Sequence, residues 1–317
     1  MFGKYKEKQH RKFGASIRES ALFSKSKWKM LIRRPFLWIV GIVLMIYVAS
    51  YIAAYAWGIL TAFKNRADYV FSPFGWPSEF HWENFSIAFR KLYVLQQADA
   101  GGSVKIFMPQ LLLNSLVYAF VAALIPCYTS AVVAYVATQY KFKFSKVLWG
   151  IVIFTMVCPI SNTLASQLQL YRALGVYDSF IGMCVIRISF TAQFILFAAC
   201  FKGFSKSYAE AAFIDGASHT RVWFSIALPL NFNQFLILYL LMFIEHWGDW
   251  YWPMIFLPSW PTASYAIYMF QFSSDKVIRA VPYQFAAALM FSLPTVAIFL
   301  VFKNKMMGGL VVGGLKG

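Results

Sequence analysis

Three residues that could carry acid–base chemistry or hold a metal stand close together in the second half of the chain. Glu245, His246 and Asp249 fall within five residues of each other. Carboxylates and an imidazole are the groups that proteins use for proton transfer and for metal ligation. One interpretation is therefore an enzyme with these three as its active cluster. No zinc-protease helix motif occurs and the other histidines are scattered, so we predict no catalytic or metal site.

The composition places this cluster in a membrane protein. Of the 317 residues, 60% are hydrophobic and only 13% are charged, whereas a soluble domain carries about 25% charged residues. Several apolar runs are continuous rather than alternating, which predicts α-helices instead of a β-barrel. The expected fold class is an all-α polytopic membrane protein with six transmembrane helices, and any enzyme here would be embedded in the membrane.

The net charge of +17 does not indicate nucleic acid, because the basic residues gather on one side of the predicted helices. Eleven of the 29 lysines and arginines lie in 1–34, ahead of the first apolar run. Basic excess marks the cytoplasmic face of a membrane protein. We therefore predict that both termini are cytoplasmic, that the arm 1–34 contacts membrane lipid, and that the protein is a multi-pass protein of the cell membrane.

The apolar runs divide the chain into five parts. They are a basic cytoplasmic arm (1–34), a first transmembrane helix (35–62), an external loop (63–109), a core with five transmembrane helices (110–303) and a glycine-rich cytoplasmic tail (304–317). The polar stretch around Glu245 follows an apolar run of only ten residues, or about 15 Å of helix. It is therefore expected near the middle of the membrane.

Arg187 is a charged residue inside the fourth apolar run, about 10 Å below its outer start. Glu245 and Asp249 lie at a matching depth of roughly 10–16 Å. A charge in a bilayer is costly and usually faces a bundle interior or a water path. We expect Arg187 to pair with one of the two acids, either as a structural tie or beside a substrate path. The path residues we predict are Arg187, Glu245, Trp247, Asp249, Trp250 and, after the kink-forming Pro159, Asn162.

The glycine-rich tail is not a phosphate-binding loop. Gly309 and Gly314 have the spacing of such a loop, but Leu315 stands where its lysine should be. We therefore predict that this chain binds no cofactor and that any ATP is bound by a separate subunit.

The most specific segment is the stretch 210–229, which reads EAAFIDGASHTRVWFSIALP within a predicted cytoplasmic loop, 203–230. Its Glu-Ala-Ala start favours helix, Gly216 permits a tight turn, and Pro229 is expected to end a second short helix. Two short helices at a bend, lying on the membrane surface, suit docking to another protein.

This segment resembles the EAA loop of ABC importer permeases. The resemblance rests on Glu210, Ala211 and Ala212, then Gly216, Ile226, Leu228 and Pro229 at the family's spacing; Asp215, Ala217 and Phe224 are similar to its carbohydrate-importer subgroup. The family usually has a second proline four residues after the first, where this chain has Asn233. The resemblance implies that these ten residues couple the chain to an ATPase.

The ending GGLVVGGLKG is similar to the tail of the maltose-type second permease subunit, which reaches between two ATPase chains. By that resemblance Gly313, Gly314 and Lys316 contact the ATPase. The implied fold is a type I ABC importer permease. The implied partners are a second homologous permease subunit, two ATPase subunits, an extracytoplasmic solute-binding protein and a carbohydrate, expected to be an oligosaccharide. An ABC permease for another small solute and the membrane-embedded enzyme remain the alternatives.

Overall fold

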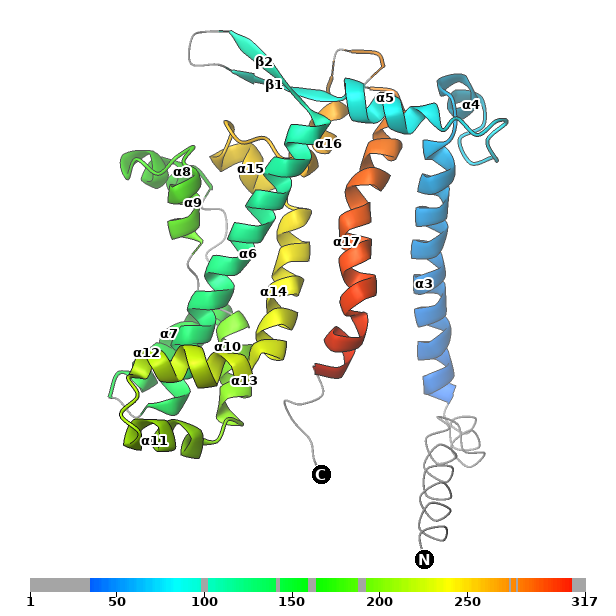
Figure 1. The fold of residues 1–317 in the computed structure, drawn as a ribbon. Helices are drawn as coiled ribbons and strands as arrows, with labels where there is room; N and C mark the ends of the chain where they lie inside the picture. Colours follow the sequence, from blue (N-terminus) through cyan, green and yellow to red (C-terminus); the bar gives the residue numbers. More distant parts are fainter. Residues whose placement is uncertain are drawn as a thin grey trace, which may run out of the picture. The chain divides into compact units, whose positions relative to one another are not determined.

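The computed structural model describes residues 35–97, 102–140, 143–158, 164–187, 192–273, 275–277 and 279–309. Helices make up most of this part of the chain (Figure 1). The chain divides into two units, Met1–Leu60 and Thr61–Gly317.

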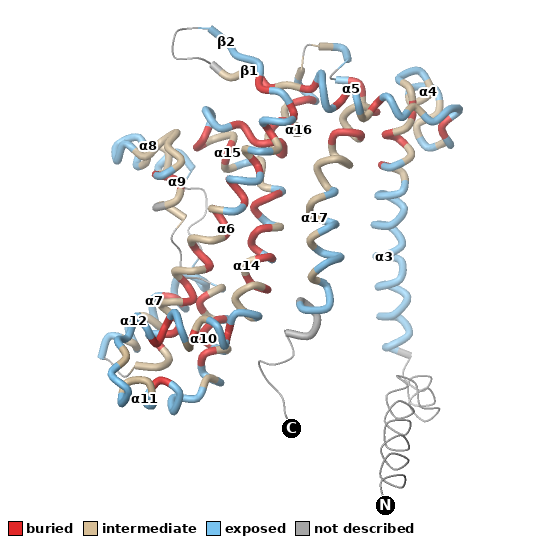
Figure 2. Tube along the Cα trace, in the orientation of Figure 1, coloured by how far each residue is buried: buried red, intermediate tan, exposed pale blue. Residues whose placement is uncertain are grey.

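The first unit contains nearly all of α3 (Pro35–Ala62). Most of this helix is exposed, pale blue in Figure 2, and its exposed residues are largely apolar. A helix that is apolar on every side is stable in lipid rather than in water. By length and composition, Phe36–Ala62 is able to cross a membrane.

The second unit begins with the predicted external segment, which is folded. It forms α4 (Arg66–Phe71), α5 (Glu83–Lys91) and a hairpin of β1 (Tyr93–Gln97) and β2 (Ser103–Phe107). The strands are antiparallel, with Tyr93 opposite Phe107. Gln96 Nε2 donates a hydrogen bond of 3.0 Å to the Ser259 carbonyl, so the hairpin is tied to the loop before α16 (Ala263–Phe270).

A buried lysine holds the loop between α4 and α5. The side chain of Lys64 is fully buried, and its Nζ donates to the carbonyls of Ser72 and Pro73, at 2.6 and 3.2 Å. Asn84 of α5 donates to the carbonyls of Ala62 and Lys64, both at 2.8 Å. Since a buried ammonium needs acceptors, the Ser72 and Pro73 carbonyls explain why a lysine is tolerated at position 64.

The central helix of this unit is α6 (Met108–Gln139), which packs against both α10 (Ala192–Lys202) and α14 (Phe232–Trp247). Pro109 stands in its first turn, where a missing N–H costs nothing. The buried face of α6 is rich in small residues, which let neighbouring helices approach closely. They include Ala119, Ala122, Ala123, Ala131 and Ala134.

The predicted third and fourth runs are interrupted in the structure. The third is divided between α7 (Ser145–Val157) and α8 (Leu164–Ala173), and the fourth between α9 (Phe180–Ile186) and α10. Of these, α7 and α10 are apolar helices too short to be counted as spans.

The remaining elements complete the unit. They are α11 (Lys206–Ile214), α12 (His219–Val222), the π-helix η1 (Trp223–Ala227), α13 (Leu228–Leu230), α15 (Tyr251–Phe256) and α17 (Val281–Gly309). Within the described residues, three helices are long and apolar enough to cross a membrane: Phe36–Ala62, Met108–Gln139 and Val281–Lys305. The pair His219–Leu230 and Phe232–Trp247, bent by 77°, counts as a fourth if it is one span. The described residues are mostly helical, as predicted, although they also contain the β1–β2 hairpin, which an all-α class does not include. The six transmembrane helices and the cytoplasmic location of both termini remain predictions.

The Lys64 contacts generate a first prediction. Lys64→Met keeps most of the side-chain volume but removes the ammonium that donates to the Ser72 and Pro73 carbonyls. We expect the loop 72–82 to lose about 1–3 kcal/mol of local stability, seen as faster cleavage of the purified protein by a nonspecific protease. Lys91→Met, at an exposed lysine that ends α5, is the control. Equal cleavage of the two variants would contradict the role given to Lys64.

Candidate functional site

The predicted docking segment forms two helical pieces joined by a glycine turn. After α11, Gly216 has a φ of +78°, a left-handed conformation that side chains with a Cβ disfavour. The Gly216 N–H bonds to the Phe213 carbonyl at 3.1 Å, and the Ala217 N–H to the Ala212 carbonyl at 2.9 Å. These two bonds form a Schellman motif, which satisfies the last carbonyls of α11. Gly216 therefore stops the first helix, as the sequence predicts.

The second piece runs through α12, η1 and α13, one residue past Pro229 to Leu230. In η1 the Leu228 N–H bonds to the Trp223 carbonyl five residues back. A proline ring clashes with the carbonyl four residues before it, so a widened turn directly ahead of Pro229 makes room for that ring.

The chain then turns at Asn231, although no proline stands at Asn233. The buried Asn231 side chain donates to the Ala227 carbonyl at 2.9 Å, and the Asn231 backbone carbonyl accepts from the Phe235 N–H at 3.0 Å. Asn231 thus satisfies backbone groups on both sides of the 77° bend into α14. The sequence analysis missed this residue, although a polar side chain between two apolar helices was the available signal.

The segment presents both acidic and apolar groups on its surface. Glu210, Ala211, Asp215, Gly216, Phe224 and Pro229 are exposed, and Ala212, Ala217, Ile226 and Leu228 are half-buried. Ile214 is 87% exposed and Phe224 is 55% exposed. Exposed apolar side chains beside a carboxylate are typical of a protein-binding surface rather than a solvated hairpin.

The opposite face of the segment is anchored in the core. Val222 is fully buried, and Trp223 donates through Nε1 to the Tyr128 hydroxyl of α6 at 3.3 Å. The Trp223 ring also lies 5.1 Å from the Tyr135 ring. At the turn, the Tyr140 hydroxyl and His219 Nδ1 are 2.9 Å apart. A force on the segment therefore reaches α6 through packed rings.

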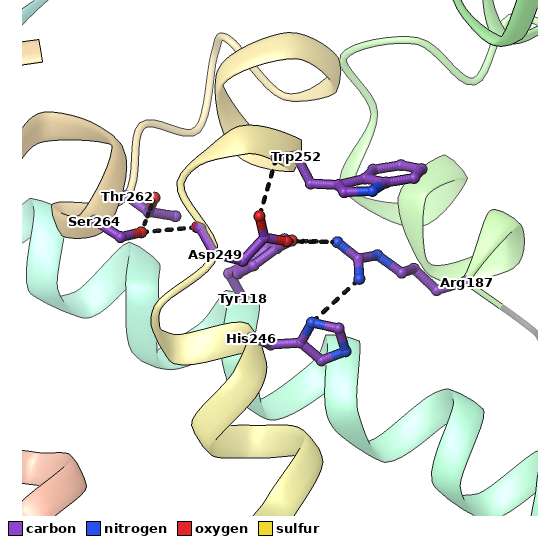
Figure 3. Close-up of polar contacts among 7 residues, drawn as sticks. All are labelled: Tyr118, Arg187, His246, Asp249, Trp252, Thr262 and Ser264. Carbon is purple, nitrogen blue, oxygen red and sulfur yellow. Dashed lines mark hydrogen bonds and ion pairs between the residues drawn. The ribbon is translucent and has the colours of Figure 1, made fainter. Parts of the chain in front are cut away.

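Figure 3 shows the second candidate site, where Arg187 meets three polar side chains. Arg187 Nη2 lies 2.9 Å from Asp249 Oδ2, and Nη1 lies 3.1 Å from His246 Nδ1. Arg187 also donates to the Tyr118 hydroxyl, which in turn donates to Asp249 at 2.7 Å. The guanidinium stacks 4.5 Å from the Trp252 ring. The predicted pairing of Arg187 with an acid is present in the structure, and the acid is Asp249.

Hydrogen bonding assigns the proton on His246. A guanidinium only donates, so Nδ1 must accept and the imidazole is neutral, with its proton on Nε2. Asp249 is also held by the Trp252 N–H, at 3.1 Å. Two of the three residues on which the enzyme interpretation rests, His246 and Asp249, are therefore bonded to Arg187. Within the described residues, no group of three His, Cys, Asp or Glu residues is placed to hold a metal ion.

Next to this cluster lies a cavity of about 340 Å³. Its walls are formed by Arg187, Glu245, His246, Gly248, Asp249, Trp250 and Trp252. Four of the six predicted path residues thus line one cavity. Trp247 does not, because it is buried, stacks on Phe291 of α17 at 4.9 Å and donates to its carbonyl at 2.9 Å. Asn162 lies outside the described residues, as do the tail residues Gly313, Gly314 and Lys316.

Tyr118 and Trp252 were missed by the sequence analysis, although both contact Arg187. Tyr118 lies on α6, about 15 Å from its start by the rise of a helix. An isolated tyrosine in an alanine-rich apolar run gives a weak signal, since tyrosine is also common in helix cores.

No family model matches the chain. Sequence relatives are nevertheless found among transport proteins. The sn-glycerol-3-phosphate transport system permease of Yersinia enterocolitica is 28% identical over 206 residues, which cover 63% of this chain and 72% of the relative. The arabinooligosaccharides transport system permease of Bacillus subtilis is 25% identical over 210 residues, covering 64% and 72%. A probable ABC transporter permease of Bacillus subtilis is 25% identical over 288 residues, covering 88% of each chain.

A solved structure has the same fold. It is a chain from a bacterial ABC transporter involved in the import of the acidic polysaccharide alginate, with a TM-score of 0.69 and 18% sequence identity. The match covers 89% of this chain and 98% of that chain.

The Arg187 cluster generates a second prediction. Side chains of Arg187 and Asp249 are only 13% and 15% exposed, so removing one charge leaves the other uncompensated. Asp249→Asn is expected to lower stability by about 3 kcal/mol, since breaking a buried pair is more costly than removing both members. The double variant Arg187→Met/Asp249→Asn should recover part of this loss. Thermal unfolding of the purified protein in detergent measures the stability of both variants relative to the wild type.

Glu245→Gln is the matched control for this prediction, because Glu245 is exposed and makes no ion pair within the part of the chain that the structure describes. If Asp249→Asn unfolds at the same temperature as Glu245→Gln, the pair contributes nothing to stability.

Proposed function

Since this chain is a homologue of ABC importer permeases, we propose that it is a membrane-spanning subunit of an ATP-driven, binding-protein-dependent importer for a carbohydrate, most simply an oligosaccharide. The observation that carries the proposal is the segment 203–230. It exposes Glu210 and Phe224 and is anchored in the core through Trp223. Such a segment is suited to receiving force from a partner.

The proposed topology has six transmembrane helices with both termini in the cytoplasm of a bacterial cell. The three long spans and the bent fourth support part of it. We assign the third and fourth spans to α7 with α8 and to α9 with α10. The excess of basic residues in 1–34 supports a cytoplasmic N-terminus.

The proposed coupling uses a separate ATPase, with ATP bound there and no cofactor on this chain. The short helices α11 and α12 would insert into a cleft of the ATPase, where Glu210 faces a basic residue. Closure of two ATPase subunits around ATP moves these helices, and the displacement passes through Trp223 to α6 and through Asn231 to α14. The docking contact then differs between two states, which is what coupling requires. Gly313, Gly314 and Lys316 are proposed to add a second ATPase contact.

The proposed translocation path includes the cavity beside Arg187, shared with a second homologous permease. The Trp250 and Trp252 rings supply flat apolar faces beside polar groups, a combination that suits sugar rings. Arg187 is neutralised by Asp249, so it shapes the cavity wall and leaves Glu245 as the free charge there. An extracytoplasmic solute-binding protein would deliver the carbohydrate.

A second candidate is an importer of a phosphorylated small solute. The relative from the sn-glycerol-3-phosphate system favours it, at 28% identity. The pairing of Arg187 disfavours it, because the cavity then offers no unpaired cation for a phosphate.

The coupling proposal predicts that Glu210→Lys loses the ATPase. We expect the variant to insert and to co-purify with its second permease from native membranes in mild detergent. The ATPase should be lost because the reversed charge meets a basic residue in the cleft. Mass spectrometry of the purified complexes measures both partners.

Glu79→Lys is the control, since it makes the same charge reversal at an exposed acid of the segment before α5. Recovery of the ATPase with Glu210→Lys, or its equal loss with Glu79→Lys, would refute docking through Glu210.

The path proposal predicts that the cavity is open to water-soluble reagents. In a background with every cysteine replaced by serine, Glu245→Cys should react quickly with a charged thiol reagent. Trp247→Cys, at a buried position two residues away, should react slowly and serves as the control. The carbohydrate delivered by the proposed solute-binding protein should slow the reaction of Glu245→Cys during transport. Equal reaction rates at the two positions would count against the path. The replaced cysteines are Cys127, Cys158, Cys184 and Cys200.

A further inference from the structure

A second cavity, of about 190 Å³, lies at the start of α17, and none of its residues lines the cavity beside Arg187. Helix α4 packs against α17 here. The walls contain three basic side chains, Arg66, Lys276 and Arg279, together with Tyr69, Val70, Ala280, Val281 and Pro282. We refer to this cavity as the basic pocket. Nothing in the proposed transport mechanism uses it.

The three cations of the basic pocket have no acidic partner within the described residues. The ion pairs there are His81 with Glu83 and Arg187 with Asp249. The two acids nearest in sequence make no ion pair with these cations and accept from backbone groups: Asp68 Oδ2 from the Ser78 N–H at 2.9 Å, and Asp275 Oδ1 from the Val277 N–H at 2.8 Å. Both carboxylates keep their negative charge, so the three cations and the two acids together remain net positive.

Three like charges around one cavity repel each other, and an anion in the cavity removes that repulsion. All three basic residues are exposed, so their charges face the solvent side of the pocket. The first turn of α17 contains no acidic residue, and its positive dipole end adds to the same potential. The chemistry of the basic pocket is therefore that of a site for phosphate.

The position of the basic pocket at a membrane interface identifies the source of that phosphate. Val281 and Pro282 line the pocket, and Val281 begins the apolar stretch Val281–Lys305 that is able to cross a membrane. The pocket therefore lies where lipid headgroups lie. Beside it, Val70 is 65% exposed and Phe71 is 88% exposed. Exposed apolar and aromatic side chains at a helix end are suited to contact with lipid rather than with water.

We infer that the basic pocket binds the phosphate of an anionic phospholipid, with Arg66, Lys276 and Arg279 around the headgroup and the acyl chains along α17. The lipid would hold α4 and the start of α17 together. This site is independent of the transported solute and of the ATPase, so it stands whether or not the proposed function is correct.

The test uses the purified complex with its native partners, depleted of lipid in detergent and titrated with phosphatidylglycerol. Native mass spectrometry measures how much lipid stays bound. The triple variant Arg66→Gln/Lys276→Gln/Arg279→Gln should need on the order of a hundredfold more phosphatidylglycerol for the same occupancy, because each basic residue near the headgroup raises the affinity for anionic lipid severalfold. Phosphatidylcholine should not replace phosphatidylglycerol in the wild type.

The matched control, Arg90→Gln/Lys91→Gln/Lys105→Gln, removes three other cations, two at the end of α5 and one on β2. It should bind phosphatidylglycerol as the wild type does. The three single variants of the basic pocket guard against misfolding of the triple variant, and each should show a smaller loss. Equal occupancy in the wild type and the triple variant would overturn the proposal. So would competition by millimolar inorganic phosphate, which would mean a free-anion site, or unchanged lipid binding with weakened binding-protein docking, which would mean an acidic protein partner.

Discussion

The close packing of α6 against its neighbours is the constraint on which the rest of the second unit depends. Lipid is as apolar as leucine, so helices in a membrane gain little from hiding apolar surface and associate through close contact. Alanines on α6 provide that contact, and the aromatic rings of α10, including Phe194, Phe197 and Phe201, fill the space beside them. Bulkier residues at Ala123 or Ala131 would separate the helices that carry both candidate sites.

The same helix connects those two sites. Tyr118 reaches the Arg187 cluster, and Tyr135 packs on Trp223 of the docking segment. Tyr135 follows Tyr118 by seventeen positions, which correspond to about 25 Å of helix. A rigid helix with one end on the cavity wall and the other on the docking surface gives the proposed coupling a physical route. The bend at Asn231 gives a second route, because α14 joins α13 to His246 and Asp249.

Charges in this protein are satisfied by different means according to where they lie. Lys64 is buried and uses backbone carbonyls. Arg187 is within the helix bundle and uses a carboxylate, a hydroxyl and a neutral imidazole. The basic pocket leaves its three cations without a protein partner in the described part of the chain, and the proposed phospholipid would supply the missing anion. The first two cases follow from the cost of an uncompensated charge away from water. The cations of the basic pocket are exposed, and there an anion would act by relieving their mutual repulsion.

The sequence by itself determined the features that depend on local chemistry. Long apolar runs required helices, and Gly216 was needed for a left-handed turn that ends α11. The spacing of Glu210, Gly216 and Pro229 carried the resemblance that the transport relatives and the shared fold support. These features were predictable because each depends on one continuous stretch of the chain and on no contact with a distant segment.

Only the tertiary structure decided which distant groups meet. By their depth in the membrane, both Glu245 and Asp249 were possible partners of Arg187. In the structure the partner is Asp249, because Tyr118 and the Trp252 N–H hold that carboxylate in place. Trp247 and Trp250 stand three residues apart in the same polar stretch, yet Trp247 packs on Phe291 and Trp250 lines the cavity. The basic pocket joins Arg66 to Lys276 and Arg279 across some two hundred residues. Such contacts depend on how whole helices rotate and cross, and that is set by packing across the bundle rather than by any local pattern.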